Sequence, residues 1–136
     1  MNERDLTLRY KVEEKTGDLL AMAVKAAQDA GGSDLKPSQV KALLRQVQTG
    51  NGVEHVCNWL RYQSVRVSTW KTSGLADAVL ADVAALRTEA ETLTKALYPG
   101  QFEEQLGLVW LALVRRYVGY LNRKFVALKK DESDEE

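Results

Sequence analysis

Two long runs of apolar residues in the second half of the chain constrain the fold most strongly. Within each run, apolar residues recur every third or fourth position, which averages close to the 3.6 residues of an α-helical turn and marks one buried helix face. Pro99 and Gly100 separate the runs and end the first helix. The first run is Leu75, Val79, Val83, Leu86, Ala90, Leu93 and Leu97, and the second is Leu106, Trp110, Leu113, Tyr117, Leu121, Phe125 and Leu128.

Three further helices are predicted upstream. One covers residues 16–30 and stops at Gly31 and Gly32, because glycine commonly terminates helices. The next begins at Pro37, a favoured first-turn residue, and ends before residues 49–52. The third starts at Val53 and continues until it frays near residues 71–74.

Residues 6–12 show a different pattern, since apolar and polar side chains alternate with a period of two. The rest of the sequence offers no strand with which this segment could pair. We favour a helix, and the alternative is an extended arm that docks on a neighbour. Short stretches give ambiguous periodicity.

The predicted fold is therefore all-α, a single bundle of about five helices over residues 1–130. A chain of 136 residues suits one domain and can bury a sizeable core without disulfides. Residues 131–136, DESDEE, are expected to be a disordered acidic tail. No apolar run is long enough to span a membrane, no secretory signal is evident, and Cys57 is the lone cysteine, so we expect a cytoplasmic protein without membrane contact.

The sequence offers no catalytic, metal or cofactor motif, so the protein is not expected to be an enzyme. His55 is the only histidine, and Cys57 lies about 200° away from it on a helix, so the two cannot pair within that helix. Cys57 is interpreted as a small core residue and His55 as a surface or boundary residue. Phosphate-binding glycine motifs are also absent from the sequence.

The formal net charge is zero, but the charges are segregated along the chain. Residues 36–71 carry six basic residues and one acidic residue, and residues 109–130 carry six basic residues and no acidic one. The remaining segments are net acidic. Segregation of this kind indicates charged partners better than the total charge does.

Helical spacing collects these basic residues into rows. Lys41 and Arg45 share one face, and Arg116, Arg123 and Lys130 share another, flanked by Arg115 and Lys129. A third row mixes aromatic and basic residues, with Arg61 nearby: Trp59, Tyr62, Arg66 and Trp70. Such rows suit an RNA backbone with stacked bases, although solvated helix faces and protein–protein contacts are competing explanations.

Three segments resemble the small helical subunit of Csm-type type III CRISPR–Cas effector complexes. LKPSQVKALLRQV (Leu35 to Val47) resembles the opening helix of that family, and WLRYQSVR (Trp59 to Arg66) resembles its Tyr-Gln-containing helix. LVWLALVRRYVGYLNRKF (Leu108 to Phe125) is similar to the aromatic-rich closing helix. The subtype, Csm-like, Cmr-like or another type III subtype, stays open.

The resemblance implies a subunit without nuclease activity. Several copies would associate into an inner filament of a ribonucleoprotein, beside other CRISPR effector subunits, and contact guide RNA and target RNA. It assigns RNA-binding roles to Lys41, Arg61 and Arg66, and helical geometry adds Arg45 and Lys71.

Two other interpretations stay open at this point. Residues 37–48 and 53–70 have about the size of a helix-turn-helix, which would make the protein a DNA-binding regulator. Alternatively, the protein is a helical protein–protein adaptor whose basic rows meet acidic partners.

Overall fold

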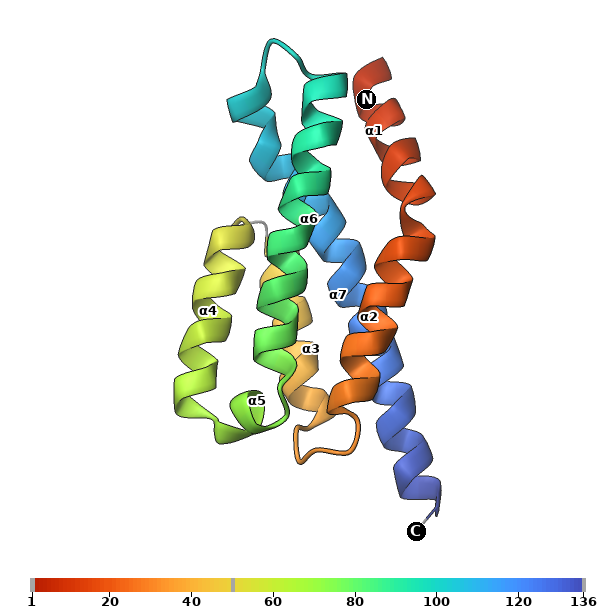
Figure 1. The fold of residues 1–136 in the computed structure, drawn as a ribbon, viewed down its shortest axis with the longest axis vertical. Helices are drawn as coiled ribbons and strands as arrows, with labels where there is room; N and C mark the ends of the chain where they lie inside the picture. Colours follow the sequence, from red (N-terminus) through yellow and green to blue (C-terminus); the bar gives the residue numbers. More distant parts are fainter. Residues whose placement is uncertain (1, 50, 136) are drawn as a thin grey trace.

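The computed structural model describes the backbone of residues 2–49 and 51–135 and the side chains of residues 2–49 and 51–130. Within these residues it contains helices and no strand, which confirms the all-α prediction. None of the described helices is long and apolar enough to cross a membrane. The helices are α1 (Glu3–Glu14), α2 (Thr16–Ala30), α3 (Pro37–Gln48), α4 (Val53–Arg66), α5 (Ser68–Thr72), α6 (Leu75–Leu97) and α7 (Phe102–Glu135) (Figure 1).

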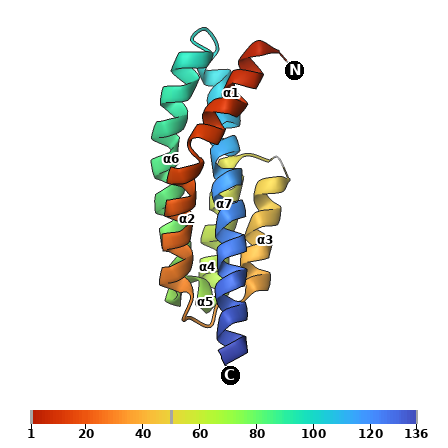
Figure 2. The ribbon, with the colours of Figure 1, turned by 90° about the vertical axis from the view of Figure 1, so that its right-hand side faces the viewer.

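Helix α7 lies at the centre of the structure, and α2, α3 and α6 pack along it. Figure 2 shows α2 and α6 on one side of α7 and α3 on the other. Because α7 has neighbours on several sides, its buried face is wider than that of a surface helix. Its fully buried side chains are Val109, Leu113, Val114, Tyr117, Val118, Leu121 and Phe125.

Two hydrogen bonds join α6 to α7. The Tyr117 hydroxyl donates to Asp82 Oδ2 at 2.5 Å, and Trp110 Nε1 donates to the Val83 carbonyl at 2.9 Å. Burial raises the pKa of the Asp82 carboxyl, and burial together with Asp82 raises the pKa of the Tyr117 phenol. The Tyr117 phenol therefore stays protonated and donates to Asp82, which helps to fix the register of the two helices.

The prediction of about five helices is wrong, because the described residues form seven. One addition is α1, which settles residues 6–12 as helix rather than an extended arm. Leu8 and Val12 are one helical turn apart and pack inward, whereas Leu6 and Tyr10 are exposed on another side. The period of two was therefore misleading, because it arises from two pairs with helical spacing, the inner Leu8 and Val12 and the outer Leu6 and Tyr10.

The other addition is α5, which separates from α4 at Val67. Val67 has extended backbone angles, φ −119° and ψ 103°, so the chain turns before Ser68. The turn buries Trp70, which is 1% exposed and packs edge-on against Trp59 at a centroid distance of 6.1 Å. Burying an indole removes about 150–250 Å² from water, worth about 4–6 kcal/mol, whereas an interrupted helix loses hydrogen bonds worth about 1 kcal/mol each.

Helix α7 continues to Glu135, but its side chains beyond Lys130 lie outside the described part. The predicted disorder of residues 131–136 falls on these positions and stays a prediction.

Candidate nucleic-acid interface

Lys41 and Arg45 lie on the outer side of α3. Helix α3 begins at Pro37, and the Gln39 side chain accepts a hydrogen bond from the Lys36 amide at 2.9 Å, which secures its first turn. The apolar residues Val40, Leu43 and Val47 are buried, so the polar positions of the same helix face outward. The two cations are one turn apart and both exposed, as predicted from their spacing.

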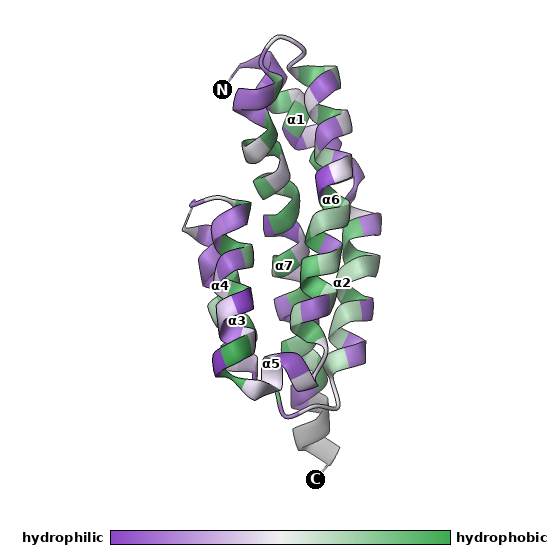
Figure 3. Ribbon diagram, turned by 60° about the vertical axis from the view of Figure 1, so that its left-hand side comes forward, coloured by the Kyte–Doolittle hydropathy of each residue, from purple (hydrophilic) through white to green (hydrophobic). Residues whose placement is uncertain are grey.

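One flank of α3 faces α4 and α5. Gln46 Oε1 lies 3.1 Å from His55 Nε2 of α4, and Gln39 Oε1 accepts from the Thr69 hydroxyl of α5 at 3.3 Å. These contacts join one flank of α3 to α4 and α5, and Lys41 and Arg45 lie about 100–160° around α3 from that flank. Hydrophilic residues dominate the column that α3 and α4 form in Figure 3.

Arg66 lies at the end of α4 and is paired with Tyr62. Its guanidinium is 5.6 Å from the centre of the Tyr62 ring, and Nη1 donates to the phenol oxygen at 3.4 Å. Tyr62 is 55% exposed, and the neighbouring Val65 is 86% exposed. This part of α4 therefore offers a base an aromatic face, an apolar contact and a cation within one turn.

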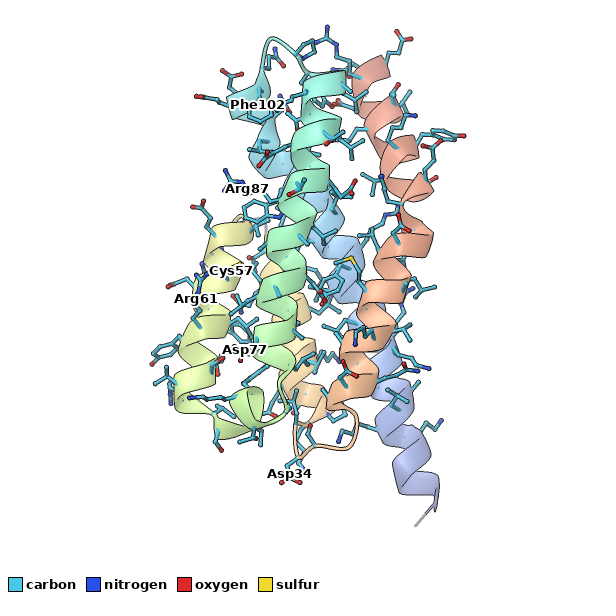
Figure 4. The ribbon with its side chains drawn as sticks, viewed as in Figure 1. Asp34, Cys57, Arg61, Asp77, Arg87 and Phe102 are labelled. Atoms are coloured by element: carbon cyan, nitrogen blue, oxygen red, sulfur yellow. The ribbon has the colours of Figure 1, made fainter. Side chains whose placement is uncertain are left out.

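Arg61 occupies a different flank of α4. Arg66 lies five positions further along the chain, which corresponds to about 140° around a helix. Figure 4 shows Arg61 beside Cys57, one turn earlier on α4. Burial raises the pKa of the Cys57 thiol, and the charge of Arg61 only partly opposes that rise, so Cys57 is a poor nucleophile.

Lys71 lies on α5, where it borders a shallow groove. The groove is lined by Ser64, Val65, Ser68, Lys71, Thr72 and Asp77. The acidic Asp77 of α6 is therefore a neighbour of this cation. Lys71 extends the basic surface from the end of α4 onto α5, with one carboxylate at its border.

All five predicted residues are exposed, and none of them forms an ion pair within the described part of the chain. They do not form one continuous row, because Arg61 and Arg66 diverge on α4. The predicted aromatic row is also divided. Trp70 belongs to the core and Trp59 is partly buried against it, so Tyr62 is the one exposed aromatic side chain of this row.

A second basic surface was left out of the predicted site. It is a groove of about 430 Å³ between α3 and α7, lined by Leu44, Val47, Gln48, Arg115, Arg116, Gly119, Tyr120, Asn122 and Arg123. The sequence signal was the seven-residue spacing of Arg116 and Arg123. That spacing reveals a shared face but does not tell which helix lies opposite.

The described residues contain no group of three or more His, Cys, Asp or Glu side chains that could hold a metal ion. His55 is exposed and contacts Gln46, and Cys57 is buried. The single histidine and single cysteine thus occupy the surface and core positions expected from the sequence.

Comparison with known proteins yields no match. The chain matches no protein-family model, no curated protein sequence and no solved structure. The resemblance to the small subunit of type III CRISPR effectors therefore stays a prediction from sequence motifs.

Proposed function

We propose that this protein is a non-catalytic small subunit of a type III CRISPR RNA-guided effector complex and contacts the backbone of guide or target RNA. The observation that carries the proposal is a set of five exposed cations on α3, α4 and α5 that make no ion pair within the described residues. The exposed Tyr62 lies beside one of them, Arg66. The five cations are Lys41, Arg45, Arg61, Arg66 and Lys71.

The physical basis is phosphate neutralisation combined with stacking. Each cation that neutralises a phosphate releases a counterion, which favours binding at low salt whatever the base sequence. Stacking of one base on an aromatic side chain adds about 1–3 kcal/mol and is equally tolerant of sequence. Tyr62 is suited to this role because Arg66 holds one side of its ring while most of the side chain is exposed.

The proposal includes a place in an assembly in the cytoplasm. Copies of the chain would line the RNA as a filament, next to the other effector subunits, and the catalytic steps would belong to those subunits. Exposed apolar side chains outside the basic surface, such as Leu6 and Tyr10 on α1, are suited to subunit contacts. Co-purification with the polymerase-like and backbone subunits of a type III complex tests this part.

The RNA contact is tested with a triple variant, Lys41→Ala, Arg61→Ala and Arg66→Ala. Anisotropy of a labelled single-stranded RNA should show at least a tenfold loss of affinity, because three exposed cations are removed. The matched control is Arg4→Ala, Arg9→Ala and Lys95→Ala, three exposed cations on α1 and α6. Unchanged affinity in a folded triple variant would refute the site.

Two probes separate this proposal from other functions. A duplex DNA bound more tightly than single-stranded RNA, with dependence on base sequence, would instead support a helix-turn-helix regulator. The complete absence of salt-dependent nucleic-acid binding would support a protein–protein adaptor.

A further inference from the structure

The groove between α3 and α7 is lined by more arginines than the packing of the two helices requires. Among the described residues that line it, the groove has three guanidinium groups and no carboxylate. Clustered like charges repel one another, so such a cluster lowers stability unless an anion or a specific partner offsets the repulsion. The structural partners of each arginine therefore decide how much positive charge is left for a ligand.

Two of the three arginines have a structural partner. Arg115 Nε donates to the carbonyl of Val47 at 2.9 Å, which satisfies one of the free carbonyls at the end of α3. Arg116 lies 3.6 Å from Glu13 of α1, a partly exposed pair whose length indicates a weak interaction. Arg123 is exposed and forms no ion pair among the described residues.

Neutral hydrogen-bonding groups lie among these cations. Tyr120 stands one turn from both Arg116 and Arg123, and its hydrogen bonds with Thr16 and Arg116 and the two positive charges lower the pKa of its phenol. Asn122 also lines the groove, and its side-chain N–H groups can donate to an anion. Its Oδ1 is buried without a hydrogen-bond partner in the described part, but this oxygen is an acceptor and needs a donor that a phosphate oxygen does not supply.

We propose that the α3–α7 groove is a binding site for a phosphate group. Guanidinium groups match the geometry of phosphate oxygens and bind them through paired hydrogen bonds. Arg116 and Arg123 supply the charge, while Arg115 is held in place by α3. The groove volume of about 430 Å³ exceeds the needs of a bare phosphate and leaves room for an attached sugar.

This inference does not depend on the proposed function, because none of the five residues of the α3–α5 surface lines the groove. The phosphate could belong to a nucleic-acid backbone or to a small phosphorylated molecule. The chemistry recognised is the same, and the experiment distinguishes the two sources.

The test is an NMR titration of the full chain with inorganic phosphate, with chloride keeping the ionic strength constant. We expect saturable shifts of the Gly119 backbone amide and the Asn122 side-chain amide, since both residues line the groove. The Arg116→Ala, Arg123→Ala double variant should bind phosphate at least tenfold more weakly. Arg9→Ala, which removes an exposed cation from α1, should bind like the wild type.

Glu13→Ala separates ligand binding from a purely structural role. It breaks the same ion pair as Arg116→Ala but leaves the positive charge in the groove. We expect Glu13→Ala to bind phosphate at least as tightly as the wild type. Shifts that rise linearly without saturation, or a folded double variant with wild-type affinity, would overturn the proposal, as would a Glu13→Ala variant weakened as much as the double variant.

A ten-nucleotide uridine RNA then identifies the source of the phosphate. Displacement of inorganic phosphate by this RNA, read at Gly119, would support the groove as a site for the nucleic-acid backbone. Phosphate binding that the RNA does not displace would support the groove as a site for a small phosphorylated ligand. Failure of RNA binding would count against the proposed function and leave the groove assignment standing.

Discussion

Replacing Trp70 and Tyr62 separately distinguishes an aromatic residue that stabilises the fold from one available to RNA. Trp70 is 1% exposed, so Trp70→Ala should lower the free energy of unfolding by about 3–5 kcal/mol. The edge-on contact with Trp59 accounts for about 0.5–1.5 kcal/mol of that value. Tyr62 is 55% exposed, so Tyr62→Ala should change the free energy of unfolding by less than about 0.5 kcal/mol.

Urea unfolding followed by circular dichroism measures the free energy of unfolding of both variants. Fluorescence anisotropy measures their RNA affinity, for which we expect the opposite ranking. Tyr62→Ala should weaken RNA binding by about 1–3 kcal/mol, the value of one stacked base, whereas folded Trp70→Phe should bind RNA like the wild type. A Trp70→Ala protein as stable as the wild type would refute the reasoning about the turn at Val67. So would an RNA affinity that falls with Trp70→Phe but not with Tyr62→Ala.

Two further predictions concern stability. Burial raises the pKa of the Asp82 carboxyl, so this group keeps its proton to higher pH in the folded protein than in the unfolded chain. The folded protein therefore loses stability as the pH rises through the raised pKa. Asp82→Asn, compared with the exposed Asp34→Asn, should therefore become relatively more stable from pH 4 towards pH 7 in urea titrations; a pH-independent difference would contradict this. Gly74 has φ +76° and open space around it, so Gly74→Ala should destabilise the fold by about 1 kcal/mol, whereas Gly107→Ala inside α7 should stabilise it by about 0.5–1 kcal/mol. Equal effects of the two glycine substitutions on thermal unfolding would show that the positive φ of Gly74 and the helical conformation of Gly107 do not determine the changes in stability.

Much of the fold could be predicted from the sequence because helical periodicity is strong in α6 and α7. Leu113, Tyr117, Leu121 and Phe125 were predicted on one face, and all four are buried. The predicted start of a helix at residue 16 agrees with α2, but the break at Val67 was missed. That break depends on tertiary packing, because Val67 turns so that Trp70 enters the core, a gain that no local pattern displays.

The candidate site was predictable only in part for the same reason. Helical spacing correctly indicated that Lys41 and Arg45 share an exposed face. It wrongly joined Trp70 to Tyr62 and Arg66, since the spacing assumed an unbroken helix. It also showed the row of Arg116 and Arg123 without revealing that α3 closes it into a groove, because side-by-side helices are a property of the folded chain.

The salt dependence of RNA affinity tests the central claim most directly. For a single strand, the slope of log K against log salt concentration is about −0.7 for each phosphate neutralised. The wild type should show a steep negative slope, and the Lys41→Ala, Arg61→Ala, Arg66→Ala variant should show a slope shallower by about 2, because three phosphate contacts are lost. Equal slopes for the wild type and the folded variant would contradict RNA contact by this surface.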